Sequence, residues 1–113
     1  MNFNLILLCV LIGFFGFKIY HSFSIKKKIP LLLKEGAIIV DVRTVGEYKG
    51  QANPESINIP LDRLSEECSK LDKNKTIILC CASGARSAAG LGILKKKGFQ
   101  HLVNAGPWKN TIV

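Results

Sequence analysis

The residues best suited to covalent chemistry are four cysteines, because a thiolate is an effective nucleophile. They lie at positions 9, 68, 80 and 81. Their spacing fits neither a disulfide framework nor a zinc site, and free thiols favour a reducing compartment. Cys9 lies in an apolar segment, and Cys68 lies on the apolar face of an expected helix. Covalent chemistry is therefore expected at Cys80 or Cys81.

Cys80 and Cys81 stand where an expected strand meets a loop. Residues 76–80 are apolar and rich in β-formers, which predicts a buried strand. Because neighbouring strand residues point to opposite faces, we predict that Cys80 is buried and that Cys81 is the exposed thiol. The small and polar residues after Cys81 predict a tight loop that opens a helix. The lysines at 95–97 and Gly98 are typical of the end of that helix.

A loop that opens a helix can hold an anion next to Cys81. Its backbone N–H groups converge, the helix dipole adds positive potential, and Arg86 supplies a fixed positive charge nearby. Such surroundings lower the pKa of a cysteine and favour the thiolate. A buried cysteine that merely ends a core strand would occupy the same position, and position alone does not separate the two interpretations.

The segment from Cys81 to Arg86 resembles the active-site loop of rhodanese-type sulfurtransferases, a cysteine followed by four residues and an arginine. Other stretches resemble the same family in the same order along the chain. These are Asp41-Val42-Arg43 followed by Glu47 and Tyr48, the segment 56–61, and the segment 98–108. The resemblance covers residues 29–113, and four motifs in the family's order are a more specific signal than any one of them.

The resemblance implies that Cys81 takes a sulfane sulfur from thiosulfate or from a protein or low-molecular-weight persulfide. Cys81 would hold that sulfur as a persulfide and pass it to a thiol acceptor. The residues around the bound sulfur would be Ala82, Ser83, Gly84, Ala85, Arg86 and Ser87. Arg86 would hold the loop and attract an anionic donor. The Ser83 and Ser87 hydroxyls would donate to the bound sulfur or cap the helix, with capping favoured for Ser87. Asp41 and Arg43 would support the loop geometry, and neither a metal nor an organic cofactor is implied.

Two other classes of function stay open at this point. One is a catalytically idle binding module that recruits a partner to the membrane, although such a module would not need the thiol. The other is a phosphatase or arsenate reductase, which also uses a cysteine and an arginine around an anion. The six-residue loop 81–86 resembles the sulfurtransferase length, since the related phosphatases have one residue more. A shorter loop also suits a sulfur atom, which is smaller than a phosphate.

Strands alternating with short helices predict an α/β domain with a largely parallel sheet flanked by helices. The site should then lie beyond the carboxyl ends of the strands. We expect strands at 37–42, 57–59, 76–80 and 100–103. We expect helices at 29–34, 44–49 and 61–71, and another after the loop. Residues 104–108 should turn back across the domain, with Trp108 packed on it.

Two local contacts are expected around the second of those helices. Thr44 and Glu47 have the spacing of a capping box, in which each side chain accepts a hydrogen bond from the other's backbone. Glu47 could also form an ion pair with Arg43.

Residues 3–17 are almost wholly apolar, and Ile19 and Tyr20 extend this stretch toward the length that crosses a bilayer. No lysine or arginine precedes the stretch, and no small-residue cleavage site follows it. An uncleaved anchor is therefore favoured over a signal peptide, whose removal would leave an exported protein. We divide the chain into an anchor at 1–25, a basic linker at 26–28 and a rhodanese-like domain at 29–113.

The formal net charge is +8, and four lysines follow the apolar stretch directly, at positions 18, 26, 27 and 28. The positive-inside rule then places the domain on the cytoplasmic side. The basic balance suits small anionic substrates and anionic lipid, whereas no nucleic-acid motif is present. The expected partners are an anionic sulfur donor or a persulfide-bearing protein, a thiol acceptor, and membrane lipid around the N-terminal helix.

Overall fold

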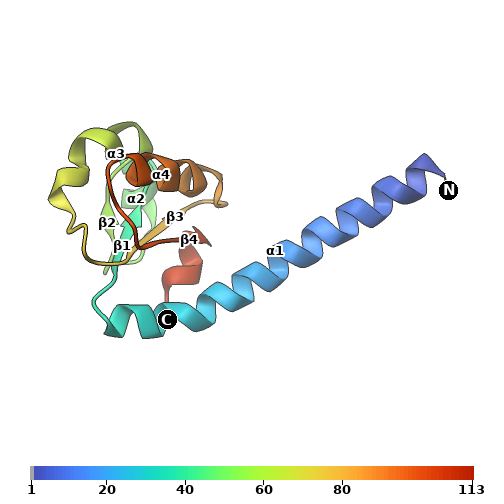
Figure 1. Cartoon of the computed structure of the whole chain (residues 1–113), viewed down its shortest axis with the longest axis horizontal. Coiled ribbons are helices and arrows are strands. Elements are labelled where there is room, and N and C mark those ends of the chain that lie inside the picture. Colours follow the sequence, from blue (N-terminus) through green and yellow to red (C-terminus); the bar gives the residue numbers. More distant parts are fainter. Residues whose placement is uncertain (1) are drawn as a thin grey trace.

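A computed structural model describes residues 2–113 of the chain. One long helix, α1 (Phe3–Lys34), leads into a small α/β domain, and its N-terminal half projects away from that domain (Figure 1). An 18-residue window of α1 has a mean hydropathy of 2.1, so the helix is long and apolar enough to cross a membrane. A signal sequence would meet the same criterion.

The domain is built on four parallel strands in the order β2-β1-β3-β4. Their bounds are Ile38–Asp41 for β1, Ile57–Asn58 for β2, Ile77–Cys81 for β3 and Leu102–Pro107 for β4. All five residues of β3 are buried, as expected for a central parallel strand covered on both faces. The structure thus confirms the predicted α/β class with a parallel sheet flanked by helices.

Helices cover both faces of this sheet. The α-helices are α2 (Val45–Gly50), α3 (Leu61–Glu67) and α4 (Ala85–Lys96), and the short 3-10 helices are η1 (Cys68–Lys70) and η2 (Trp108–Thr111). One apolar cluster joins Leu64 of α3 and Leu94 of α4 to Leu79 of β3. A second cluster, on the other face, joins α1 and η2 to Ile78 and Cys80. The capping box of Thr44 and Glu47 is confirmed at the start of α2.

The C-terminal part of α1 belongs to the second cluster. Ile25 is 6% exposed and Ile29 is fully buried, and each such side chain contributes about 2 kcal/mol when it leaves water. Asn110 of η2 donates a hydrogen bond from Nδ2 to the Ser22 hydroxyl over 3.3 Å. The half of α1 nearest the domain is therefore fixed against it by both apolar and polar contacts.

Three local predictions need correction. Residues 26–28 are helical rather than a linker, and the helix expected at 29–34 is the last part of the continuous helix α1. The helix expected at 61–71 ends as an α-helix at Glu67 and continues as the 3-10 turn η1. The assignment of an anchor and a domain to separate ranges of the chain stays a prediction.

The end of the sheet also differs from the prediction. The last strand is Leu102–Pro107, so residues 104–107 extend the sheet where a turn was expected. Asn104 pairs with Leu79 and Gly106 pairs with Cys80, so that a bulge leaves one extra residue in β4. The bulge lets β4 continue beside β3 as far as Cys81, which brings the two strand ends together. Trp108 is buried on the domain, as predicted.

Candidate active site

Cys81 is the last residue of the central strand β3, and the loop 82–84 joins it to α4. This places the thiol beyond the carboxyl ends of parallel strands, where binding sites occur in α/β folds. Cys80 and Cys81 belong to the two apolar clusters on opposite faces of the sheet, as predicted. The expected exposure of Cys81 is wrong, since both cysteines are 1% exposed. The Cys81 sulfur is buried because the loop folds back over it and donates hydrogen bonds to it.

Three donor groups converge on the Sγ atom of Cys81. The backbone N–H of Gly84 lies 2.9 Å from the sulfur. The backbone nitrogen and the hydroxyl oxygen of Ser87 each lie 3.5 Å from it. Because Ser87 is in the first turn of α4, the positive end of the helix dipole also faces the sulfur. We call these three donors the cradle: the N–H groups of Gly84 and Ser87 with the Ser87 hydroxyl.

The hydrogen bonds of the cradle outweigh the effect of burial on the pKa of Cys81. Burial alone would raise the pKa of Cys81. Hydrogen bonds from the Ser87 hydroxyl and from the N–H groups of Ser87, Gly84 and Ser83 outweigh burial, so that the pKa lies below the ordinary value. The thiolate is thereby favoured in a site closed to bulk water, which is the state required of a nucleophile.

Gly84 gives the loop its shape. Its φ of +108° is a left-handed conformation that side chains disfavour, and it places the Gly84 N–H on the sulfur. A Cβ at this position would lie 3.2 Å from the Cα of Gly106, at the end of β4. Two glycines from distant parts of the chain therefore let the loop pack directly on the last strand.

Ser87 does not have the capping role expected of it. The residue at the N-cap of α4 is Gly84, which makes no side-chain capping bond. The Ser87 hydroxyl lies 2.7 Å from Oδ1 of Asn104 and 3.1 Å from the Gly84 carbonyl oxygen, as well as 3.5 Å from the sulfur. A hydroxyl has one hydrogen, so it donates to one of these atoms at a time, and the nearest acceptor is Asn104 Oδ1. Ser87 thus ties the start of α4 to β4, and its hydroxyl donates to the sulfur when it turns away from Asn104.

Asn104 is a site residue that the sequence reasoning missed. Its Nδ2 donates to the Gly84 carbonyl over 3.2 Å, and its Oδ1 accepts from the Gly106 N–H over 2.9 Å. The side chain of Asn104 therefore ties the loop to β4. An asparagine two residues before a glycine is a known signal for such a local turn, but the bond to the loop spans 20 residues of sequence.

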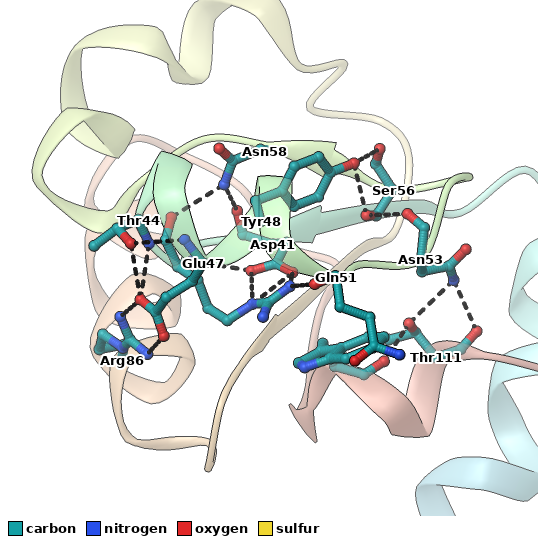
Figure 2. Close-up of polar contacts among 12 residues, drawn as sticks. Asp41, Thr44, Glu47, Tyr48, Gln51, Asn53, Ser56, Asn58, Arg86 and Thr111 are labelled. Carbon is teal, nitrogen blue, oxygen red and sulfur yellow. Dashed lines mark hydrogen bonds and ion pairs between the residues drawn. The ribbon is translucent and has the colours of Figure 1, made fainter.

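Arg86 pairs with Glu47 rather than facing the sulfur. Its Nη1 and Nη2 donate to the two carboxylate oxygens of Glu47 over 2.7 and 2.9 Å, and Figure 2 shows this bidentate ion pair. Hydrogen bonds from Arg86 and Thr44 lower the pKa of Glu47 to about 2. The pairing of Glu47 with Arg43 that the sequence suggested is wrong. The contact of Arg86 with Glu47 ties the first turn of α4 to α2.

Asp41 and Arg43 form a buried ion pair at the end of β1. Arg43 Nη2 lies 2.8 Å from a carboxylate oxygen of Asp41 and 2.8 Å from the Gln51 carbonyl oxygen, and its guanidinium lies 4.9 Å from the centre of the Trp108 ring. Asn58 donates to the backbone carbonyls of Asp41 and Arg43 (Figure 2). These contacts fix the loop after β1 and the start of η2.

The exposed residues Ala82 and Ser83 of the loop and Ala85 at the start of α4 face outward, with Gly84 beside them. Together they line one side of an open cavity of about 660 Å³, whose other sides come from β4 and α1. Cys81 lies behind the loop and does not line this cavity. Within residues 2–113, no group of three His, Cys, Asp or Glu side chains is arranged to hold a metal ion.

Comparisons with known protein families, sequences and structures all identify rhodanese-like proteins or sulfurtransferases as similar to this chain. The sequence profile of the rhodanese-like domain matches residues 27–108. A putative sulfur carrier protein of Bacillus subtilis, YrkF, is 34% identical over 73 residues, covering 65% of this chain and 40% of YrkF. The thiosulfate sulfurtransferase PspE of Escherichia coli is 34% identical over 73 residues, covering 63% of this chain and 70% of PspE. A solved structure described as a rhodanese with anions from E. coli superposes with a TM-score of 0.62 at 33% identity, covering 69% of this chain and 94% of that one.

Proposed function

Because this chain belongs to the rhodanese-like domain family, whose members here include sulfurtransferases, we propose that it transfers sulfane sulfur through a persulfide on Cys81. The observation that carries this proposal is the convergence of the Gly84 N–H, the Ser87 N–H and the Ser87 hydroxyl on one sulfur atom. Donors fixed in advance around an anion stabilise charge without a reorganisation cost during the reaction.

The first half-reaction loads Cys81. Its thiolate attacks the outer sulfur of thiosulfate, a new S–S bond forms, and the old S–S bond breaks with its electron pair leaving on sulfite. The products are a cysteine persulfide anion and sulfite, so the total charge of −3 is conserved. A persulfide of a protein or of a small thiol would react in the same way and release its own thiolate.

The second half-reaction unloads Cys81. The thiolate of an acceptor attacks the outer sulfur of the persulfide, and the electron pair of the breaking bond returns to the sulfur of Cys81. The cradle holds negative charge on sulfur in both the resting and the loaded state, so the same donors serve both half-reactions. The ion pair of Arg86 with Glu47 would hold the first turn of α4 against α2 in both half-reactions.

The test is intact mass measurement of the full-length protein after incubation with thiosulfate. We expect a gain of one sulfur atom that is mapped to Cys81 and removed by a thiol. Cys81→Ser should abolish the gain, whereas Cys80→Ser and Cys68→Ser should keep it. If no donor loads wild-type protein, the chain is an idle binding module; equal loss in Cys80→Ser would mean that the thiol is wrongly assigned.

We further propose that α1 is a single-span anchor and that the domain lies on the cytoplasmic side. The support is the length and hydropathy of α1 together with the lysines that follow its apolar half. Full-length protein should sediment with membranes and resist carbonate extraction, and protease added outside intact spheroplasts should leave the domain uncut. Cleavage by external protease, or a soluble product lacking the first residues, would refute the anchor with this orientation.

A further inference from the structure

The cavity in front of the loop has one wall from α1. Its volume is about 660 Å³, within the range of small-molecule sites. One side is the loop around Gly84, another is the end of β4, and the third is α1 from Phe14 to Ser22. The helix proposed as the membrane anchor is thus also a wall of the cavity that borders Gly84, a residue of the cradle.

The position of that wall is set by packing. Ser22 bonds to Asn110, and the buried Ile25 and Ile29 follow at helical spacing on the same face. No glycine or proline interrupts residues 17–29. Because a regular helix transmits its orientation from one turn to the next, the face that packs on the domain continues as the face over the cavity. Phe14, Lys18 and His21 belong to that continuation.

Lys18 gives this cavity its fixed positive charge. The loop side contributes only the neutral residues Ala82, Ser83, Gly84 and Ala85. Arg86, the cation next to them in sequence, is paired with Glu47 at 2.7 Å. Among the described lining residues, the ionisable ones are Lys18 and His21, both on α1. The Nζ atom of Lys18 lies 5.3 Å from the centre of the Phe14 ring, so the ammonium is held beside an apolar wall.

We infer that α1 completes the sulfur-donor site, with Lys18 binding the anionic end of the donor and Phe14 and Phe17 binding an apolar substituent. This inference rests on the proposed function and names its substrate class: anionic sulfane sulfur donors that carry an apolar group. Since the cavity lies where the apolar half of α1 ends, such donors would also concentrate beside it at a membrane surface.

An aryl thiosulfonate is a suitable probe of this class. The Cys81 thiolate attacks its terminal sulfur, and the bond between that sulfur and the sulfonyl sulfur breaks with the electron pair on the leaving sulfinate. One thiolate and one thiosulfonate anion thus give one persulfide anion and one sulfinate anion, and no further oxidant or reductant is needed.

The experiment measures single-turnover loading of Cys81 in the full chain, held in lipid nanodiscs, as a function of donor concentration. The donors are thiosulfate and benzenethiosulfonate. Lys18→Gln should raise the half-saturating concentration of both by about two- to fivefold, as expected for an exposed charge contact. Lys18→Arg should restore it. Lys27→Gln is the matched control, because it removes an equal charge from the same helix outside this cavity.

The apolar wall is tested with Phe17→Ala and its control Phe15→Ala, which lies next to the cavity lining but not in it. Phe17→Ala should raise the half-saturating concentration of benzenethiosulfonate by about fivefold, but that of thiosulfate by less than about twofold. The inference is overturned if Lys18→Gln behaves like Lys27→Gln, or Phe17→Ala like Phe15→Ala. Failure of the proposed function is a different result, since wild-type protein would then load with neither donor.

Discussion

Cys80 and Cys81 are neighbours in β3 and are equally buried, yet their surroundings shift the pKa values of their thiols in opposite directions. Burial raises the pKa of Cys80 to about 12, and the nearby Asp41 carboxylate adds to that rise. Burial also opposes ionisation of Cys81, but the cradle more than offsets it and lowers the pKa. Equal burial therefore does not fix the direction in which the pKa of a thiol shifts.

The two faces of the sheet explain the difference. Cys80 faces α1 and Trp108 within an apolar cluster. Cys81 faces the start of α4, where backbone N–H groups lack partners inside the helix and turn to the sulfur instead. The comparison teaches that convergent donors, rather than access to water, favour the thiolate at one of two adjacent cysteines.

The largest expected contrast is in alkylation. A thiol with a pKa of about 12 is ionised in about one molecule per ten thousand at pH 8. Iodoacetamide at pH 8 should therefore modify Cys81 more than about a thousandfold faster than Cys80. Tandem mass spectrometry of the peptide that contains both residues measures the two rates. Unfolded protein is the control, since both cysteines should then react alike; similar rates in folded protein would refute the contrast.

The next effect is on the loop itself. Gly84→Ala should destabilise the protein by about 1–3 kcal/mol, because alanine is strained at a φ of +108° and its Cβ would approach Gly106. Urea unfolding followed by tryptophan fluorescence measures this change. Gly92→Ala is the matched control: nothing lies within 4 Å of its added Cβ in α4, and a gain of about 0.5–1 kcal/mol is expected. Equal stability of the two variants would show that Gly84 does not shape the loop.

The smallest effect concerns one donor of the cradle. Ser87→Ala removes a hydroxyl contact but keeps the N–H groups of Gly84 and Ser87, so the pKa of Cys81 should rise. Because a higher pKa lowers the thiolate fraction at any given pH, the pH profile of alkylation should shift toward higher pH. At pH values below the pKa, the alkylation rate of Cys81 should decrease by less than about tenfold. Ser83→Ala, which alters an exposed side chain and keeps its N–H, should leave the profile in place. An unshifted Ser87→Ala profile would show that the hydroxyl does not stabilise the thiolate.

Much of the fold is readable from local patterns. The strand before Cys81, the capping box at Thr44 and the helix ending near Gly98 all follow from residue types within one element. The extension of β4 to Pro107 does not, because Asn104 and Gly106 are typical turn residues when read alone. They remain in the sheet because β3 lies beside them and the bulge adjusts their register.

The candidate site, too, was predicted only in part from the sequence. The cysteine, the loop length and the helix that follows were apparent from sequence, whereas the burial of Cys81 and the partners of Ser87 were not. Arg86 illustrates the reason: both Arg43 and Arg86 are chemically suited to Glu47, and the nearer one in sequence is the wrong one. Arg43 is unavailable because its guanidinium is held by Asp41 and by the Gln51 carbonyl.

The amino-acid sequence by itself determined the apolar helix, the positions of the strands along the chain and the thiol placed before a helix, since spacing and residue type encode backbone conformation locally. Only the tertiary structure decided which donors meet the sulfur, which acid neutralises Arg86 and which face of α1 lies over the loop. The last two of these join residues tens of positions apart, whereas the donors are three and six positions from Cys81 and meet its sulfur only because the loop folds back. They depend on how strands and helices pack in space, which no short stretch of sequence specifies.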